Sequence, residues 1–279
     1  MSTHGTSSSG TAGTAGTGFT GGLEGKTAVI YGAGGVLGGG IAREFAREGA
    51  RVFLAGRTPA TLEAVAADIR AAGGQAGTDV VDALDEDAVQ NHLDKVVATA
   101  GRVDVSLNLI KRGDVQGVPL VDMTADDLLR AVTNGLRSNF LTARAAARQM
   151  ARQGSGVILH LNSASGDGAF PGMGSTGPAD AATESFMRYL AAETGPQGVR
   201  VCGIWTAGVA ETFETNKLTE VNANATDPQA ALDMIASMSA MRRTPRLADV
   251  AAVAAFLASD RASGITGTMT NVTAGLVLR

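Results

Sequence analysis

The sequence predicts an α/β fold: a single Rossmann-type, doubly wound parallel sheet with helices on both faces. From Lys26 onward, short apolar runs alternate with segments whose apolar residues have helical spacing. This alternation is typical of parallel sheets covered by helices. Hydrophobic residues make up 44% of the chain and charged residues 18%, which is enough for a sizeable core. We therefore expect one domain over residues 23–279.

The expected strands and helices follow one another in a regular order. The first apolar run ends in a glycine-rich turn, after which Leu37, Ile41 and Phe45 lie four residues apart on one helix face. Pro59 opens the next helix, and Asp85 is placed to cap the one after it. The expected strands are residues 27–31, 51–55, 75–81, 103–109, 157–162, 199–205 and 268–273. The expected helices cover residues 37–45, 59–69, 85–97, 124–152, 176–194, a segment that begins at 227, and 247–259.

Residues 1–22 differ in composition from the rest of the chain. They are almost wholly Gly, Ser, Thr and Ala, and the first charged residue is Glu24. Such a segment has little to bury, so we expect a flexible tail. It has neither the basic start nor the apolar centre of a secretory signal. No apolar run reaches transmembrane length. The expected protein is therefore soluble and cytoplasmic.

The charge balance and the few sulfur and imidazole groups exclude several classes of function. Lys and Arg number 23 and Asp and Glu 27, which gives a net charge of −4 and argues against nucleic acid or an anionic membrane as partner. A single cysteine, Cys202, excludes an internal disulfide and a four-thiolate zinc site. His4, His92 and His160 are too scattered to predict a metal site. We expect a small-molecule substrate.

The glycines after the first strand indicate a phosphate site. Gly32, Gly35 and Gly38 lie between a predicted strand and a predicted helix. Backbone N–H groups and the positive end of a helix dipole can meet a pyrophosphate there, and a Cβ would block the tight turn. A glycine-rich turn without a ligand is the alternative interpretation.

The end of the second strand indicates which dinucleotide is bound. It reads Gly56-Arg57, about twenty residues beyond the glycines, where a ribose hydroxyl or a 2′-phosphate is recognised. An acidic residue there favours NAD, whereas an arginine suits the 2′-phosphate. We therefore expect NADP(H) to be preferred over NAD(H). The alternative is that Arg57 is an ordinary exposed arginine.

The order of elements and several motifs over residues 23–279 resemble the short-chain dehydrogenase/reductase family. The Gly32-x-x-Gly35-x-x-Gly38 spacing resembles that of its extended and atypical members. The resemblance implies that Asp82 meets the adenine, that Asn108, at the start of the turn after the fourth strand, binds the cofactor, and that Thr212 touches the nicotinamide end. Residues 155–163 resemble the strand that ends in the catalytic serine, here Ser163. Residues 198–208, 256–260 and 265–268 also match family segments, with Ala207 in place of a proline. The family transfers hydride between a nicotinamide and a carbonyl or alcohol.

The resemblance breaks at the catalytic positions. The family's tyrosine falls on Thr176, its lysine four residues later on Asp180, and its helix asparagine on Gly135. A threonine hydroxyl is too weak an acid to replace a phenol. An aspartate raises the pKa of a neighbouring acid instead of lowering it. Only Ser163 stays in register, so the chain is expected to be a divergent member with a non-standard site.

Two charged residues are candidates to replace the missing groups. Lys111, in the turn after the fourth strand, could supply a cation or an acid, or it is a solvated loop lysine beside Arg112. Asp180 could hold ribose hydroxyls or act as a base, or it is an aspartate favoured at a helix N-terminus. His160 lies three residues before Ser163 on the strand, so it is expected to face the opposite side and to be structural.

Three functions remain open at this stage. The first is an NADP(H)-dependent oxidoreductase whose proton donor is non-standard. The second is a pseudoenzyme that binds a nucleotide without turnover. The third is a non-redox cyclase, lyase or isomerase that uses Ser163 with Asp180.

The region after the sixth strand is expected to roof a substrate pocket. Residues 210–246 are less regular and rich in methionine, which suits an adaptable lid, although core or subunit contacts are the alternative. Its apolar side chains are Phe213, Met234, Ile235, Met238 and Met241. Small residues over 178–192 allow close helix packing, so we expect a homodimer or homotetramer.

Overall fold

The computed structural model describes residues 21–213, 222 and 227–278. Its strands form one seven-stranded sheet of order β3-β2-β1-β4-β5-β6-β7, with every neighbouring pair parallel. The chain starts near the middle, winds to one edge and then crosses to the other, so the predicted doubly wound fold is confirmed. The strands are β1 Thr27–Tyr31, β2 Arg51–Gly56, β3 Gln75–Val80, β4 Val105–Asn108, β5 Gly156–Asn162, β6 Val199–Thr206 and β7 Met269–Val272.

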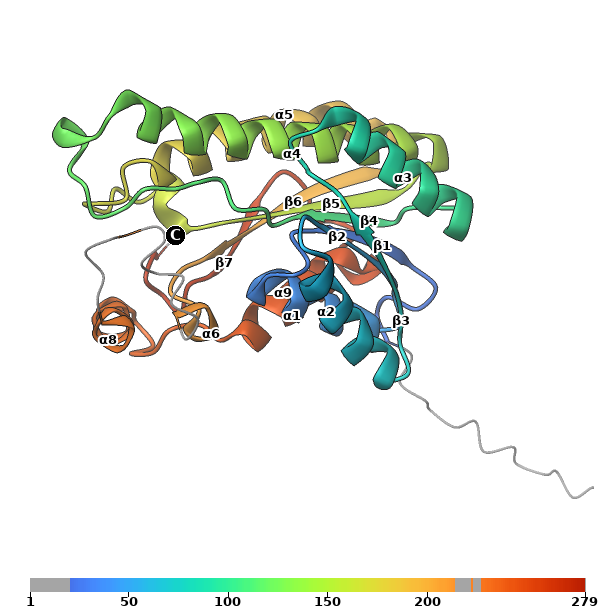
Figure 1. Cartoon of the computed structure of the whole chain (residues 1–279), viewed down its shortest axis with the longest axis horizontal. Helices are drawn as coiled ribbons and strands as arrows, with labels where there is room; N and C mark the ends of the chain where they lie inside the picture. Colours follow the sequence, from blue (N-terminus) through green and yellow to red (C-terminus); the bar gives the residue numbers. More distant parts are fainter. Residues whose placement is uncertain (1–20, 214–221, 223–226, 279) are drawn as a thin grey trace, which may run out of the picture.

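Two layers of helices enclose the sheet (Figure 1). On one face lie α1 Val36–Arg47, α2 Pro59–Ala71 and α9 Leu247–Ala258. On the other lie α3 Glu86–Ala100, α4 Ala125–Gln153 and α5 Thr176–Thr194. Two short helices, α6 Ala210–Phe213 and α8 Pro228–Met238, follow β6. Because helices cover both faces of the sheet, the ends of the strands remain accessible. Ligands bind at the carboxyl ends of the strands in such sheets.

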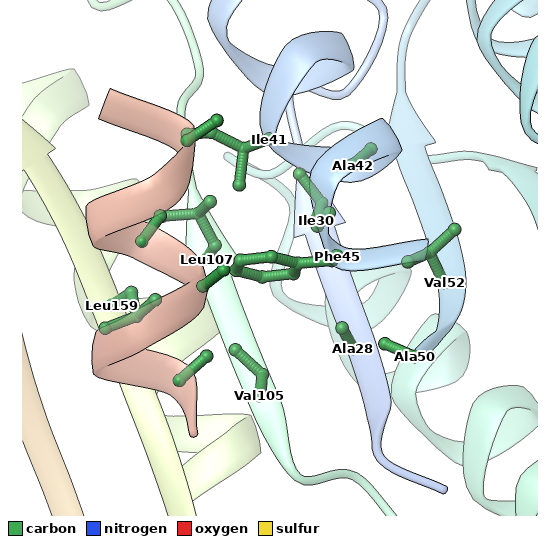
Figure 2. Packing of buried hydrophobic residues seen from close by; sticks show 14 of the residues in the cluster. Ala28, Ile30, Ile41, Ala42, Phe45, Ala50, Val52, Val105, Leu107 and Leu159 are labelled. Carbon is green, nitrogen blue, oxygen red and sulfur yellow. The ribbon is translucent and has the colours of Figure 1, made fainter. Parts of the chain in front are cut away.

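Each helix layer has its own buried core. In the first, Phe45 and Ile41 of α1 pack on Ile30 of β1 and Leu107 of β4 (Figure 2). In the second, Val89 and Leu93 of α3 and residues of α4 and α5 cover the opposite face. Asp85 caps α3 as expected, accepting a hydrogen bond from the amide of Ala88 at 3.1 Å. The fourth strand is shorter than the expected residues 103–109.

The folded unit begins slightly earlier than the composition indicated. Gly22, the last residue of the expected tail, donates its N–H to Glu48 Oε2 at 2.8 Å. A Cβ on Gly21 would lie 2.1 Å from the carbonyl oxygen of Glu48. Residues 1–20 of the expected tail lie outside the described part of the chain. Within the described residues, every helix is too short or too polar to cross a membrane.

Only part of the expected lid can be placed. Residues 214–221 and 223–226 lie outside the described part. In α8, Ile235 packs over Gly208, where a Cβ would lie 2.9 Å from the Ile235 side chain. Met234, Met238 and Met241 are 58%, 54% and 60% exposed. These methionines therefore present an apolar surface to solvent in this structure.

Candidate active site

A cavity of about 270 Å³ opens at the carboxyl ends of β1, β2 and β4. This is the point where the strand order reverses from β1 toward β4, the usual ligand position in doubly wound sheets. The predicted residues that line it are Gly32, Gly35, Arg57, Asp82 and Lys111. Further lining comes from Gly34, Gly56, Thr58, Thr61, Leu62, Val81, Ala83, Leu84, Leu109 and Ile110.

Backbone geometry explains the glycines at this cavity. Gly32 has φ +79°, and a Cβ there would lie 2.5 Å from the carbonyl oxygen of Leu109. Gly38 does not line the cavity, but a Cβ on it would lie 2.4 Å from the carbonyl oxygen of Gly32. Both glycines therefore let the turn, α1 and β4 approach closely.

The first turn of α1 faces the cavity without a side-chain cap. Gly35 is its N-cap residue and offers no side-chain oxygen to the N-terminal amides. Unpaired N–H groups at a helix N-terminus bind phosphate readily. A pyrophosphate therefore fits this end of the cavity.

Side chains that suit a nucleoside surround the rest of the cavity. Arg57 is exposed and lies at its edge. Asp82 is exposed and accepts a hydrogen bond from the amide of Leu84 at 3.0 Å, which fixes its loop. The lining residues thus fit the adenosine and pyrophosphate parts of a dinucleotide.

Two residues predicted to bind the cofactor form hydrogen bonds to nearby groups of the protein instead. Asn108 is 6% exposed, donates to Ser138 Oγ at 3.2 Å and accepts from the amide of Ile110 at 3.1 Å. It shapes the turn after β4 and does not line the cavity. Thr212, in α6, donates its hydroxyl to the carbonyl of Val209 at 2.7 Å.

At the carboxyl end of the neighbouring strand β5, the predicted catalytic residues Ser163 and Asp180 meet, and the predicted Thr176 is the first residue of α5. Ser163 follows β5 and donates its hydroxyl to Asp180 Oδ2 at 2.5 Å. Asp180 is wholly buried. Thr176 is 3% exposed, and its hydroxyl accepts a hydrogen bond from Gln116 Nε2 at 3.1 Å.

The cation beside Asp180 is Arg112, the neighbour of the expected Lys111. Arg112 Nη1 lies 2.6 Å from Asp180 Oδ1, and its Nη2 lies 2.7 Å from Asp114 Oδ1. A Cβ on Gly135 would lie 2.7 Å from Cδ of Arg112. The missing side chain at position 135 therefore makes room for the arginine.

Burial and the ion pairs have opposite effects on the pKa values of Asp180 and Arg112. Burial raises the pKa of Asp180 to about 6, although Arg112 and the Ser163 hydroxyl favour its ionised form. Burial also disfavours the charge on Arg112, but Asp180 and Asp114 hold its pKa above the usual value. Arg112 is therefore a permanent cation, whereas Asp180 changes charge close to neutral pH.

Comparisons with known proteins agree with this geometry. The family model described as enoyl-(acyl carrier protein) reductase matches residues 32–277. An uncharacterized oxidoreductase of Mycobacterium tuberculosis is 32% identical over 255 residues, which are 91% of this chain and 93% of that protein. The oxidoreductase UcpA of Escherichia coli K12 is 31% identical over 92% of this chain and 96% of its own length.

The chain belongs to the short-chain dehydrogenase/reductase family. A solved 7α-hydroxysteroid dehydrogenase, complexed with NADH and 7-oxo glycochenodeoxycholic acid, superposes with a TM-score of 0.81 at 29% identity, covering 91% of this chain and 94% of that one. The relatives are oxidoreductases and dehydrogenases, so the chain is an oxidoreductase of the short-chain dehydrogenase type.

Within this short-chain dehydrogenase framework, sequence reasoning missed Arg112. The sequence pattern predicts a role for Lys111 and gives Arg112 only as its neighbour, although it also shows an acidic residue at 180 and a glycine at 135. A buried acid requires a counter-charge, and a glycine on a helix facing that acid marks space for a long side chain. Together, these two observations indicate that a cationic side chain from the turn after β4 lies beside Asp180.

The expectation that His160 faces away from Ser163 is wrong. His160 lines a cavity with Glu184 and Met187 of α5, and the Ser163 hydroxyl also bonds a residue of α5. Side chains point alternately to the two faces of a sheet only for residues within a strand. β5 ends at Asn162, and Ser163 already begins a 3-10 turn.

Proposed function

We propose that this protein is an NADP(H)-dependent oxidoreductase that interconverts a carbonyl and an alcohol on a small-molecule substrate. One observation carries the proposal. Two consecutive residues of the β4 turn join the nucleotide cavity to the acid–serine pair, because Lys111 lines the cavity and Arg112 pairs with Asp180. A cofactor in the cavity would therefore extend along the strand ends toward Ser163.

Residues at the end of β2 support a preference for NADP(H). Arg57 follows Gly56, and the hydroxyl-bearing Thr58 and Thr61 line the same end of the cavity. Arginine and hydroxyl groups suit a 2′-phosphate. Acidic residues that would favour a free ribose hydroxyl are absent from positions 56–58.

The proposed proton path runs through Ser163 to Asp180. When bound, NADP(H) supplies or accepts the hydride at the substrate carbon. In alcohol oxidation, the Ser163 Oγ takes the proton of the substrate hydroxyl, while its own proton passes over the 2.5 Å hydrogen bond to Asp180 Oδ2. In carbonyl reduction both proton transfers reverse. The pair thus takes the place of a tyrosine as the acid and base.

Arg112 sets the protonation state of this pair. Its guanidinium lies 2.6 Å from Asp180 and favours the carboxylate against the effect of burial. Asp114 is the other acid on Arg112, and its charge raises the pKa of Asp180. Glu184, one helical turn beyond Asp180, is engaged by the indole N–H of Trp205 at 2.8 Å.

The pH dependence of turnover tests the proton path. Alcohol oxidation needs the carboxylate, so its rate should rise with pH through about 6, the pKa of Asp180. Arg112→Gln removes the nearby cation and should move the midpoint upward by about one to three units. Asp114→Asn removes a nearby negative charge and should move it downward. Midpoints that stay equal in all three proteins would contradict the role of Asp180.

Calorimetric titration with NADPH and NADH tests the nucleotide site directly. We expect NADPH to bind more tightly than NADH, and Arg57→Asp to remove that preference. Arg148→Asp is a matched control, because Arg148 is exposed near the end of α4 at the opposite edge of the sheet. If neither nucleotide binds, the oxidoreductase proposal fails and the non-redox use of Ser163 with Asp180 gains support.

Burial of the catalytic positions favours a second candidate, a protein that binds the nucleotide without turnover. Thr176 is 3% exposed and Asp180 is wholly buried, so a substrate can meet the acid only through Ser163. Tight NADPH binding, together with no oxidation or reduction across a panel of alcohols and ketones, would support this candidate. Turnover in wild type that Ser163→Ala abolishes, with nucleotide binding unchanged, would support the oxidoreductase instead.

We further propose that the protein forms a homodimer or homotetramer through the outer face of α4 and α5. Leu129 and Phe140 of α4 and Tyr189 of α5 are 55%, 41% and 70% exposed. Exposed large apolar side chains on the outer faces of helices are typical of subunit interfaces. Light scattering of the purified protein gives the oligomeric state. A monomer at all concentrations would contradict the proposal.

A further inference from the structure

Two hydrogen-bonded pairs of side chains lie along the first two turns of α5, and one member of each pair is accessible. The Ser163 hydroxyl donates to Asp180 Oδ2 at 2.5 Å, and Gln116 Nε2 donates to Thr176 Oγ1 at 3.1 Å. Asp180 and Thr176 are buried, whereas Ser163 and Gln116 are only partly buried. A substrate can therefore touch Ser163 and Gln116. The proposed proton path gives Gln116 no role.

The two accessible groups are held on one face of α5. Thr176 and Asp180 are four residues apart in this helix, so their side chains lie about 5–6 Å apart on the same face. Gln116 is bound to the first and Ser163 to the second. One oxygen that accepts a hydrogen bond of about 2.8 Å from each of two donors spans a similar distance. The spacing therefore allows a single substrate oxygen to contact both Ser163 and Gln116.

The backbone on both sides of Gln116 is fixed to the segment that leads into α5. The wholly buried Ser175 hydroxyl accepts the N–H of Val115 at 2.7 Å and donates to the carbonyl of Val115 at 2.8 Å. The amide of Gly117 donates to the carbonyl of Gly172 at 2.8 Å. These bonds place Gln116 before any substrate binds. A donor that is held in advance stabilises a developing charge without a cost of reorganisation.

The carboxamide of Gln116 keeps hydrogen-bonding capacity for a ligand. A carboxamide carries two N–H donors and one acceptor oxygen. Thr176 accepts one N–H, and among the described residues the second N–H and the oxygen have no partner. Thr176 is also the position where the family has its tyrosine, so the carboxamide of Gln116 lies beside the place of the missing phenol. Gln116 can therefore donate a hydrogen bond where the phenol would have done so.

We propose that Gln116 is a catalytic residue that donates its second N–H to the reacting oxygen of the substrate, beside Ser163. This assignment rests on the proposed oxidoreductase function. In carbonyl reduction the carbonyl carbon gains a hydride, its π bond to oxygen breaks, and negative charge develops on the oxygen. Ser163 gives its proton to that oxygen and regains one from Asp180. Gln116 stabilises the charge by its hydrogen bond and keeps its own proton. In alcohol oxidation the same transfers reverse.

Steady-state reduction of ketones by NADPH, with cyclohexanone as the first probe of the panel, tests the assignment. Gln116→Leu removes the N–H donor and should lower kcat about a hundredfold. KM should change much less, because the charge on oxygen develops only in the transition state. Gln75→Leu is the matched control, since Gln75 is exposed at the start of the edge strand β3, and it should leave kcat unchanged. A kcat in Gln116→Leu equal to that of wild type would overturn the assignment.

The hydroxyl that holds Gln116 provides a second test. Thr176→Val removes this hydroxyl and should lower kcat about tenfold. Because Thr176 acts through Gln116, the double variant should be no slower than Gln116→Leu alone. Additive losses of kcat would overturn the assignment.

Two further outcomes separate this assignment from the proposed function. Turnover that Ser163→Ala abolishes and Gln116→Leu leaves intact would overturn only the role of Gln116. A wild type that binds NADPH and reduces no ketone of the panel would overturn both. Calorimetry should show equal NADPH affinity in Gln116→Leu and wild type. A loss of NADPH binding in Gln116→Leu would indicate a structural role for Gln116 and overturn the assignment.

Discussion

The cavity proposed to bind the nucleotide and the start of α5 both lie at the carboxyl ends of the strands, but they depend on different kinds of interaction. At the cavity, backbone geometry dominates: Gly32 has a positive φ and α1 begins without a side-chain cap. At α5, a buried ion pair between Arg112 and Asp180 joins two segments 68 residues apart in sequence. Backbone sites tolerate changes in side chains, whereas a buried ion pair requires both partners.

The strongest test of this difference removes one partner of the ion pair. Arg112→Leu leaves Asp180 buried beside no cation, and we expect a loss of about 3–5 kcal/mol in the free energy of unfolding. At the cavity, Arg57→Asp alters an exposed side chain and should change the free energy of unfolding by less than about 0.5 kcal/mol. Urea denaturation measures both values. Comparable losses in the two variants would remove the distinction between the regions.

Replacing both partners of the ion pair provides the control. The double variant Arg112→Leu with Asp180→Leu leaves no buried charge from the pair, so it should recover most of the stability that the single change loses. A double variant no more stable than Arg112→Leu would show that the loss comes from packing of the arginine stem and not from the charge left behind.

A glycine substitution tests the backbone site in turn. Gly32→Ala combines a positive φ with a Cβ 2.5 Å from the carbonyl oxygen of Leu109. It should cost about 2–4 kcal/mol and weaken nucleotide binding. Gly25→Ala is the matched control, because Gly25 has φ +71° with nothing within 4 Å of the added Cβ. Thermal unfolding of both variants should show a smaller loss for Gly25→Ala, about 1–2 kcal/mol. Equal losses of unfolding free energy would mean that the backbone strain of the positive φ, and not the close approach to the residue after β4, makes glycine necessary at position 32.

The pH dependence of stability tests the buried acid without any substrate. The pKa of Asp180 is raised from 3.8 to about 6. Between about pH 4 and 6 the folded protein therefore holds a proton on Asp180 that the unfolded chain releases, so the contribution of Asp180 to stability falls as pH rises through this window. Burial lowers the pKa of His160 to about 4, which gives a change of opposite sign over the same range. The test is therefore the stability of wild type minus that of Asp180→Asn, measured by denaturation at several pH values. This difference should fall by about 3 kcal/mol across the window, since each pKa unit is worth about 1.4 kcal/mol. A difference that does not vary with pH would contradict the raised pKa of Asp180.

The smallest expected effect concerns a helix cap that supports the nucleotide side. Asp85→Ala removes the side-chain bond to the amide of Ala88 and should cost about 1 kcal/mol. Thr58 occupies the N-cap of α2 without such a bond, so Thr58→Ala should change the unfolding free energy much less. Equal effects in the two variants would show that the Asp85 hydrogen bond adds little in solution.

Features that depend on neighbouring residues were predictable from the sequence. The strand and helix order, the glycine turn and the Asp85 cap all follow from local spacing, and the structure reproduces them. The strand ends shifted by one or two residues, because hydrogen-bond pairing and not apolar content sets where β4 begins.

Features that depend on distant side chains were not predictable in the same way. The spacing around Thr176 and Asp180 indicated only that the usual groups are missing. Which cation meets Asp180 depends on the path of the turn after β4, and Lys111 and Arg112 are equivalent in sequence terms. Likewise, exposure of Met234 depends on how α8 packs, which the methionine pattern does not specify.

The Arg112–Asp180 pair restricts how the residues at these two positions can change during evolution. Changing Asp180 to lysine alone would place two cations together in a buried site, and losing Arg112 alone would strand a carboxylate. Each intermediate costs several kcal/mol, at or beyond the margin that mutational drift tolerates. The two charges therefore exchange only together, or in a background with stability to spare, as do Gly135 and the arginine it accommodates. Laboratory evolution that changes one residue at a time should therefore rarely replace either charge.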